Sequence, residues 1–261
     1  MRDYGQFCPI ARSSELLAER WTPIIVRNLL HGCRTFNEIR QGAPRISTAL
    51  LAQRLDMLER HGVLVRIVNP SGRGATYQLT EMGLALKAVM DAMGQWGSRW
   101  LEIEPRHMDP GYVLWATLKL IDLAQLPEQT TVVRFELRDP PAEEYWLLLQ
   151  RPRPELCTRS HGHTEDLVCR TDSTTLIDLH LKRLAYRTAI REGLVELVGP
   201  RRLTRQFPRW FRTSPFADFT PDDPGRTASH TNDTAGQPLV GSVSTDTWTD
   251  SPVTDPAPSL R

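Results

Sequence analysis

Apolar residues recur at helical spacing in the first sixty residues, and glycines end several of the runs. Pro9 begins a first predicted helix, because proline is tolerated at the first helical position. Thr22-Pro23 is the expected cap of a second helix, which ends at Gly32. The residues expected on the inner faces of these two helices are Ile10, Leu16, Leu17, Ile24, Ile25, Leu29 and Leu30.

Two more helices with polar caps are predicted between residues 35 and 62. Thr35 and Glu38 have the spacing of a capping box, which predicts a short third helix that stops at Gly42. Ser47 is the expected N-cap of a fourth helix, which runs to about His61 before a glycine ends it.

The hydrophobic period then changes from helical to alternating. Residues 63–68 and 76–79 are two β-like runs, and the glycine-rich, basic segment between them predicts a hairpin. Thr80 and Glu81 begin a long amphipathic helix that reaches Trp100. Helices, a hairpin and a flanking helix in this order predict a winged helix-turn-helix domain over residues 1–104.

A second group of elements is predicted in residues 110–217. Asp109-Pro110 begins a helix that reaches about residue 120. Apolar runs predict strands at residues 131–137, 145–149, 155–158, 166–170 and 194–198. Further helices are expected at residues 174–181, 184–192 and 200–211. These elements predict an α+β domain in which helices pack on a mainly antiparallel sheet.

Residues 218–261 are rich in Pro, Thr, Ser, Asp and Gly and contain few large aliphatic side chains. Such a segment buries too little apolar surface to offset its conformational entropy, so we expect a disordered tail. The chain is therefore expected to consist of residues 1–104, residues 110–217 and this tail, with Glu104–Asp109 as the linker between the first two.

The formal net charge of +1 hides an uneven distribution of charge along the chain. Residues 1–104 carry 13 basic and 10 acidic side chains, residues 105–217 carry 17 and 14, and the tail carries 2 and 7. A small positive excess is common among proteins that do not bind nucleic acid, so charge alone does not indicate DNA binding.

The fourth predicted helix has the pattern of a helix that reads DNA. Its leucines share one side, and small or polar side chains occupy the other. Small side chains let a helix approach base edges, Gln53 can pair with adenine, and a Thr or Ala methyl group can contact thymine. Nearby arginines are expected to bind phosphates. The predicted DNA-contacting residues are Arg45, Ser47, Thr48, Ala49, Gln53, Arg54, Arg60 and, at the hairpin tip, Arg73.

The alternative is that this face is an ordinary solvated surface, which is the commoner outcome for any one of these residues taken alone. The ordered combination of helices, hairpin and small-residue face favours DNA binding.

Residues 8–101 resemble the HxlR family of bacterial transcriptional regulators. The matching motifs are Cys8-Pro9, ERWTPII at 19–25, RTFNEI at 34–39, Ile46-Ser47, Arg54-Leu55, GVLVR at 62–66 and YQLT at 77–80. The resemblance implies a homodimer that binds double-stranded DNA at a near-palindromic operator, with one recognition helix per half-site. Two departures stand out: Ala18-Glu19-Arg20 replaces the usual Gly-Gly-Lys, and Gly72-Arg73-Gly74 replaces a proline-bearing stretch in the wing.

Cys8 is a candidate redox sensor, because the resemblance implies that some relatives sense oxidants or electrophiles through a cysteine at this position. The N-terminus of a helix that begins at Pro9 would favour the reactive thiolate. The alternative is that Cys8 is a small buried hydrophobe.

Residues 110–217 resemble the sterol carrier protein type 2 (SCP2-like) fold, a lipid-binding domain. The matching motifs are short, and they are DLV at 166–168, RTD at 170–172, Ala189-Ile190 with Gly193, Leu197 with Gly199-Pro200, FPRW at 207–210 and SPFA at 214–217. The resemblance implies an apolar cavity for a hydrophobic small molecule. Candidate lining residues are Trp115, Leu118, Phe135, Trp146, Leu148, Leu176 and Ile190, each of which could instead belong to a solid core.

Other chemistries find little support in the sequence. Cys157, His161, His163 and Cys169 are zinc-ligand types, but C-x3-H-x-H-x5-C is not a familiar zinc spacing. No GxSxG, Walker or GxGxxG motif is present, so we expect neither an enzyme nor a bound cofactor. Four cysteines without a CxxC pair, no signal peptide and no apolar run of membrane-spanning length predict a soluble, cytoplasmic protein.

Together these patterns favour a DNA-binding transcriptional regulator, with repression as the commoner outcome, that responds to a hydrophobic molecule in its second domain. The linker Glu104–Asp109 would couple that molecule to the placement of the recognition helices. The alternative is a lipid or small-molecule carrier whose helical N-terminal domain serves only dimerisation, although dimerisation would not require the small, polar face from Thr48 to Gln53.

Overall fold

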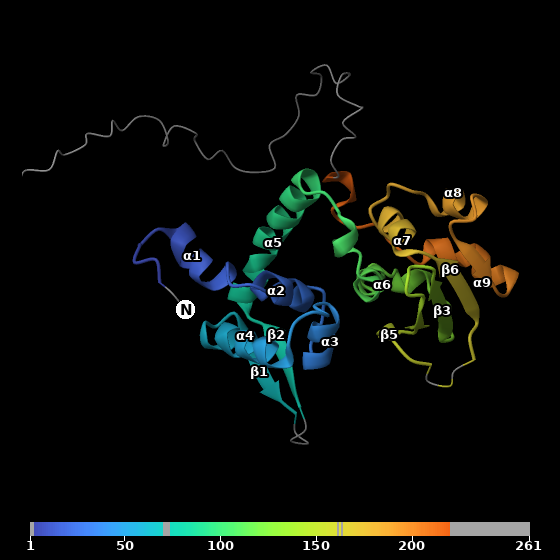
Figure 1. The fold of residues 1–261 in the computed structure, drawn as a ribbon. Coiled ribbons are helices and arrows are strands. Elements are labelled where there is room, and N and C mark those ends of the chain that lie inside the picture. The colour runs from blue at the N-terminus through green and yellow to red at the C-terminus, as the bar shows by residue number, and fades with distance from the viewer. Residues whose placement is uncertain (1–2, 70–73, 161, 163, 220–261) are drawn as a thin grey trace, which may run out of the picture. The chain divides into compact units, whose positions relative to one another are not determined.

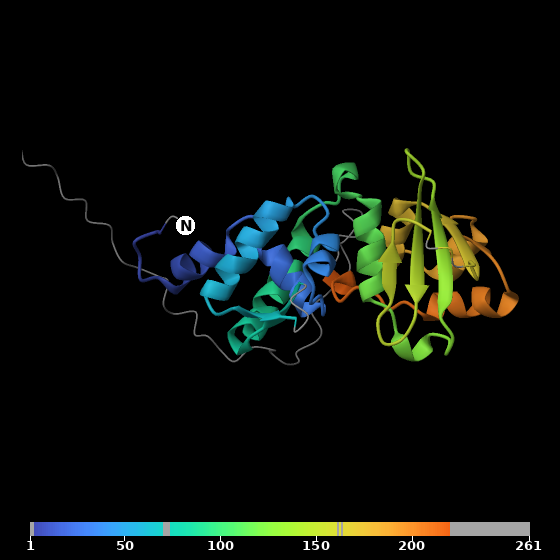
Figure 2. The same ribbon diagram turned by 90° about the horizontal axis from the view of Figure 1, so that it is seen from below.

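The structure, a computed structural model, describes residues 3–69, 74–160, 162 and 164–219 (Figures 1 and 2). These residues lie within one unit of the chain, which extends to Pro221. We refer to residues 3–104 as the N-terminal half and to residues 105–219 as the C-terminal half. The expected tail lies outside the described residues from position 220 onward.

The N-terminal half follows the predicted order of helices, hairpin and helix. Its elements are α1 (Pro9–Leu17), α2 (Thr22–Leu30), α3 (Phe36–Gln41), α4 (Thr48–Arg60), β1 (Leu64–Val68), β2 (Ala75–Leu79) and α5 (Glu81–Trp100). Strands β1 and β2 pair antiparallel, from Leu64 opposite Leu79 to Val68 opposite Ala75. The winged helix-turn-helix arrangement expected from the sequence is therefore confirmed.

Side-chain caps begin most of these helices where the sequence predicted them. Thr35 accepts a hydrogen bond from the Glu38 amide in a complete capping box, and Ser47 accepts one from the Leu50 amide. Helix α2 differs, because its N-cap is Trp21 in a left-handed conformation (φ 77°), and Thr22 is the first helical residue.

A hydrophobic core joins α2, α3, α4 and the hairpin. Its fully enclosed members include Ile25, Leu29, Ile39, Leu51 and Leu55. The expectation that Ile10 faces inward is wrong, because 74% of this residue is exposed on α1.

The C-terminal half begins with a one-turn 3-10 helix and continues with α-helices, strands and three more short 3-10 turns. Its elements are η1 (Pro105–His107), α6 (Pro110–Lys119), η2 (Leu123–Gln125), β3 (Thr131–Leu137), β4 (Glu143–Leu149), β5 (Glu155–Cys157), β6 (Leu167–Thr171), α7 (Ser173–His180), α8 (Tyr186–Arg191), β7 (Glu196–Val198), α9 (Arg201–Gln206), η3 (Phe207–Arg209) and η4 (Ala217–Phe219). The five strands form one sheet in the order β5-β4-β3-β6-β7.

Only β3 and β6 pair in parallel, so the sheet is mainly antiparallel, as predicted. Side chains alternate between its faces, and one face packs against the helices around Leu114, Leu176 and Trp210 (Figure 2). The other face bears polar side chains of β3, β4 and β6. Helices on one face of a sheet make this half an α+β fold.

Helix α6 contributes to both cores. Leu114 and Leu118 pack in the core of the C-terminal half, whereas Trp115 packs in that of the N-terminal half and is only 3% exposed. The Trp115 ring lies so close to Gly42 that a Cβ atom there would approach within 2.5 Å. A glycine at the end of α3 is thus required for this packing.

Candidate nucleic-acid interface

Helix α4 is held by buried contacts on one side and by a short turn at its start. Leu51, Leu55 and Leu58 are at most 1% exposed. The Asn28 side chain, fully buried in α2, donates to the Ile39 carbonyl at 2.8 Å and so fixes α3 against α2. The buried leucines of α4 pack in the same core as α2 and α3, so this core sets the position of α4.

The opposite side of α4 has no covering protein in the part of the chain that the structure describes. Ser47, Thr48, Ala49 and Gln53 are all exposed. The sequence placed these same residues on one outward face, and the structure brings them together there. A row of small side chains followed by an amide suits contact with the edges of base pairs.

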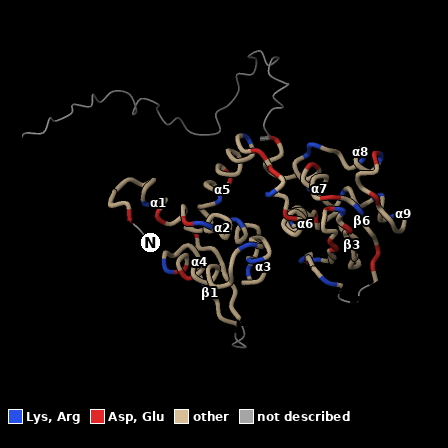
Figure 3. The backbone as a smooth tube through the Cα atoms, in the orientation of Figure 1, with Lys and Arg blue, Asp and Glu red and all other residues tan. Residues whose placement is uncertain are grey.

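Lys and Arg are interleaved with Asp and Glu along the described backbone (Figure 3). The arginines predicted to bind phosphates differ in their surroundings. Arg45 has a 70% exposed side chain that lies 4.0 Å from the Asp109 carboxylate. Arg60 is exposed at the end of α4 and donates to the Asp56 carbonyl at 3.4 Å. Arg73 lies outside the described residues. Exposed guanidinium groups near both ends of α4 are placed as phosphate contacts require.

Arg54 is not free in this structure, although the sequence analysis treated it as a phosphate-binding residue. Its Nη2 pairs with Glu19 Oε2 at 2.6 Å, and its Nε donates to the Arg20 carbonyl at 3.2 Å. Only 14% of the side chain is exposed. Glu19, one of the departures from the family pattern, holds this guanidinium, and phosphate binding would require the pair to break.

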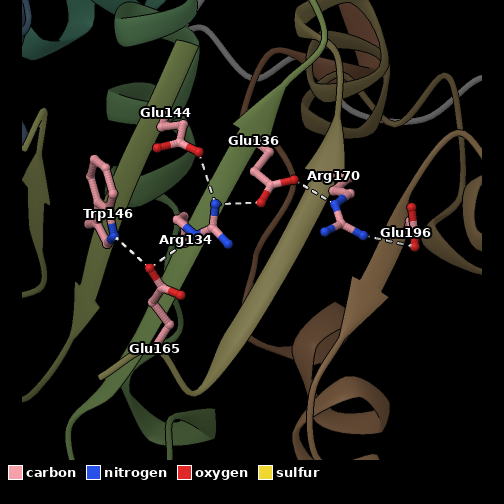
Figure 4. Close-up of polar contacts among 7 residues, drawn as sticks. All are labelled: Arg134, Glu136, Glu144, Trp146, Glu165, Arg170 and Glu196. Atoms are coloured by element: carbon pink, nitrogen blue, oxygen red, sulfur yellow. Dashed lines mark hydrogen bonds and ion pairs between the residues drawn. The ribbon is translucent and has the colours of Figure 1, made fainter. Parts of the chain in front are cut away.

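The open face of the C-terminal sheet also carries arginines, but their charges are neutralised (Figure 4). Arg134 pairs with Glu136, with Glu144 at 2.9 Å and with Glu165 at 3.0 Å. Arg170 pairs with Glu136 at 2.5 Å. The Arg170 guanidinium lowers the pKa of Glu136 and keeps it ionised. A face on which carboxylates surround the arginines repels the phosphates of DNA, so α4 is the better candidate.

Helix α5 carries a stripe of exposed apolar side chains. The members of this stripe are Met82, Val89, Met93, Trp96 and Trp100, which are 40–62% exposed. Their spacing of seven, four, three and four residues puts them on one side of the helix. Exposed aromatic and aliphatic side chains gathered on one face are typical of a surface that packs against another protein.

The ligand residues expected from the sequence are not gathered around one cavity. Trp115 and Leu118 line a cavity between α2, α3, α6 and β5, Leu176 lines a second between α7 and η3, and Trp146 lines a third on the open sheet face. Phe135 is 1% and Leu148 is 9% exposed, so both are core residues, whereas 39% of Ile190 is exposed.

The four metal-ligand types weighed in the sequence do not converge among the described residues. Cys157 lies on β5 and Cys169 on β6, with two strands between them in the sheet. Strands lie about 4.8 Å apart, so these two thiols are separated by roughly 14 Å and cannot share an ion. His161 and His163 lie outside the described residues.

Cys8 is half-buried and directly precedes Pro9, the first residue of α1. Its side chain makes no capping hydrogen bond to the helix. The described helices include none with the length and apolar character that crossing a membrane requires.

Sequence reasoning missed the residues that join the two halves of the chain. Arg27 of α2 donates to the Tyr112 hydroxyl at 2.9 Å and to the Gly42 carbonyl at 2.6 Å. Its guanidinium carbon lies 5.2 Å from the centre of the Trp115 ring. Arg27 therefore links the turn before α4 to α6, and no local spacing in the sequence signals this contact.

Comparison with known proteins places the N-terminal half in a family. Residues 16–105 match the family model described as HxlR-like helix-turn-helix. The chain is 34% identical over 107 residues to YvaP of Bacillus subtilis (strain 168), named an uncharacterized HTH-type transcriptional regulator, and the match covers 40% of this chain and 97% of YvaP. It is 38% identical over 97 residues to the HTH-type transcriptional regulator YodB of the same organism, covering 36% of this chain and 87% of YodB.

Among solved structures, the reduced form of YodB from B. subtilis matches with 37% identity and a TM-score of 0.33, covering 37% of this chain and 97% of that chain. The family match ends at residue 105, the first residue of the C-terminal half, so it covers none of the elements from α6 onward.

Proposed function

This chain belongs to the HxlR-like helix-turn-helix family, and from that premise we propose that it is a sequence-specific, DNA-binding transcriptional regulator. The observation that carries the proposal is the outward face of α4, where exposed Thr48, Ala49 and Gln53 lie in front of a row of buried leucines. Such a face fits a major groove, because small side chains allow close approach and the amide can read a base edge.

In this proposal each residue has a separate role in binding. Gln53 pairs with an adenine, and the methyl groups of Thr48 and Ala49 contact thymine. Arg45 and Arg60 bind phosphates on either side and fix the register, and Ser47 caps the helix that they flank. Arg73 contacts the neighbouring groove or backbone from the wing.

We propose further that the regulator is a homodimer on a near-palindromic operator. The apolar stripe on α5 supports this, because a second copy of the same stripe would cover Trp96 and Trp100. Two α4 helices spaced by about 34 Å would then reach successive major grooves on one side of the duplex. A dimer seated on a promoter would exclude polymerase, which favours repression.

For the C-terminal half we propose a regulatory and not an enzymatic role, in an SCP2-like fold that responds to a small molecule. Supporting this, α6 packs in both cores through Leu114 and Trp115, so a change in the C-terminal half reaches the elements that position α4. The segment Glu104–Asp109 also belongs to this route, because Asp109 caps α6 and lies 4.0 Å from Arg45. Cys8 remains a proposed oxidant-sensing thiol at the start of α1.

The experiment that tests the proposal is a gel shift with the promoter DNA beside the protein's own reading frame. We expect a shifted band that unrelated DNA of the same length does not compete away. Gln53→Ala should lose this preference while retaining salt-sensitive binding. Gln125→Ala is the matched control, because Gln125 is exposed on η2 in the C-terminal half. Equal preference in wild type and Gln53→Ala would contradict the assigned base contact.

A further inference from the structure

A cavity of about 470 Å³ lies where the two halves of the chain meet. Its lining comes from the end of α2, from α3, from α6 and from the segment that precedes β5. A volume of this size is typical of sites for small organic molecules. It is also bounded by Gln41, which directly precedes the turn into α4, so an occupant would contact the segment that positions α4.

One wall of the cavity is apolar. Leu118 and Ile121 belong to α6 and the residues that follow it, and Leu156 belongs to β5. The Trp115 ring contributes to the same lining. Leu156 packs against both hydrophobic cores, so this wall is fixed by the cores of the two halves. A flat or branched apolar group would gain by leaving water for this surface.

The polar groups around the cavity leave a positive charge available. The Lys119 ammonium lies 5.5 Å from the centre of the Trp115 ring and shares a hydrogen bond with the Cys33 thiol, and it forms no ion pair with a described carboxylate. Arg153, 66% exposed, lies 3.7 Å from Glu38. An ammonium has three N–H donors and a guanidinium has five, so both cations can bind an additional acceptor.

The two acidic side chains in the lining already have partners. Partial burial opposes ionisation of Glu38, but the amides of Arg34 and Thr35 donate to its carboxylate and lower its pKa. Glu155 is exposed and accepts a hydrogen bond from Gln150 at 3.3 Å. Neither carboxylate forms an ion pair with Lys119. Besides its hydrogen bond with the Cys33 thiol, the Lys119 ammonium keeps N–H donors for an anionic group.

His31 completes the polar side of the cavity without adding a charge. Its ring meets the Trp115 ring edge-on, with the centroids 6.3 Å apart. Partial desolvation and the nearby cations Arg27 and Lys119 lower its pKa, so the imidazole is neutral at pH 7. The positive charge without a carboxylate partner therefore lies with Lys119, and Arg153 keeps free N–H donors beside its pair with Glu38.

We propose that this cavity is a binding site for a small monocarboxylate with an apolar body. The carboxylate pairs with Lys119 and Arg153, and the body packs on Leu118, Ile121 and Leu156. The regulatory role of the site rests on the proposed function. The sequence predicted a purely hydrophobic ligand inside the C-terminal half, whereas this inference places an anionic ligand between the two halves.

Calorimetric titration of the full chain with 2-naphthoate and with its uncharged amide, 2-naphthamide, tests the site. We expect one naphthoate per chain and binding of the amide at least tenfold weaker, because the amide cannot form the ion pairs. Lys119→Met should weaken naphthoate binding about tenfold and leave the amide affinity unchanged. Arg153→Met should act in the same direction, and its side chain is 66% exposed.

Lys182→Met is the matched control, because Lys182 lines a different cavity, between α7 and η3. Equal affinities for naphthoate and the amide, absence of naphthoate binding, or equal effects of Lys119→Met and Lys182→Met would each overturn the proposal. DNA binding is measured separately and without probe. A chain that binds DNA but not naphthoate overturns this inference alone, and one that binds naphthoate but not DNA overturns the proposed function alone.

Discussion

The two halves of the chain differ in what they leave exposed on their surfaces. In the N-terminal half, α5 exposes Trp96 and Trp100, and Arg60 has no ion pair with a described residue. In the C-terminal half, the open face of the sheet pairs Arg134 and Arg170 with carboxylates, and both tryptophans of the helical layer, Trp115 and Trp210, are buried.

This difference indicates which surfaces are suited to contact with another molecule. Covering an exposed apolar stripe, or pairing the guanidinium group of Arg60 with a phosphate, lowers the free energy of the protein. A sheet face whose charges are already paired gains little from contact with DNA. The N-terminal half therefore carries the helix-turn-helix surface, and its exposed α5 stripe is the surface that we propose to pack against a second copy.

The largest effect is expected from removing the ring that joins the halves. Trp115→Ala should lower the free energy of unfolding by about 3–5 kcal/mol, because it leaves a cavity beside Gly42. Trp146→Ala, on the open sheet face, should cost less than about 1.5 kcal/mol, because this side chain is only half-buried. Urea denaturation followed by circular dichroism measures both. Similar losses for the two variants would show that burial of Trp115 between the halves does not stabilise the fold to the expected extent.

The next effect concerns the apolar stripe on α5. Trp96→Glu should raise the dissociation constant of the proposed dimer by at least 30-fold, about 2 kcal/mol, because it would bury a charge in the proposed interface. Light scattering coupled to size-exclusion chromatography gives the mass at a series of concentrations. Gln95→Glu adds the same charge at an exposed neighbouring position outside the stripe and should leave the mass unchanged. A Trp96→Glu dimer as stable as wild type would place the interface elsewhere.

The next, smaller effect is on DNA affinity, and it is expected from removing an arginine that has no ion pair with a described residue but not from removing one that is paired. Arg60→Ala should weaken DNA binding by about 1–2 kcal/mol and reduce the slope of log affinity against log salt by about one. Arg134→Ala should leave both quantities unchanged, because the Arg134 charge is shared among carboxylates. Fluorescence anisotropy over a range of salt concentrations distinguishes them. A reduced slope for Arg134→Ala would show that the sheet face meets DNA.

The smallest effect is a gain. Glu19→Gln removes the carboxylate that holds Arg54, so the guanidinium can turn toward a phosphate. We expect DNA affinity to rise by less than about 1 kcal/mol, since an exposed phosphate contact is partly screened by salt. Glu59→Gln controls for the loss of one negative charge, because Glu59 is exposed on α4, the helix that carries Arg54. An equal gain in both variants would assign the effect to net charge.

Local spacing in the sequence was sufficient for most elements of the fold. The capping pair Thr35 and Glu38, the caps Ser47 and Thr80, and Asp109 before α6 all lie within three residues of the amides that they bind. Strand β4 begins two residues earlier than predicted, because Glu143 and Glu144 are polar yet pair with β3.

The candidate site was only partly predictable, because local spacing does not record contacts between residues far apart in the sequence. The outward face of α4 follows from helical periodicity, and its exposure agrees with the pattern of leucines behind it. The pair of Glu19 with Arg54 and the packing of Trp115 beside Gly42 join residues 35 and 73 positions apart. No short period in the sequence records such contacts, so only the folded chain could show them.

The central claim is that the outward face of α4 meets DNA. The most direct test inserts the same charge into each half and measures the affinity for the promoter duplex by fluorescence anisotropy. Ala49→Glu on α4 should weaken binding at least 100-fold, because it brings a carboxylate against the bases and phosphates. Ala142→Glu, exposed beside β4, should bind as wild type does. Unchanged affinity for Ala49→Glu, or a comparable loss for Ala142→Glu, would contradict the account.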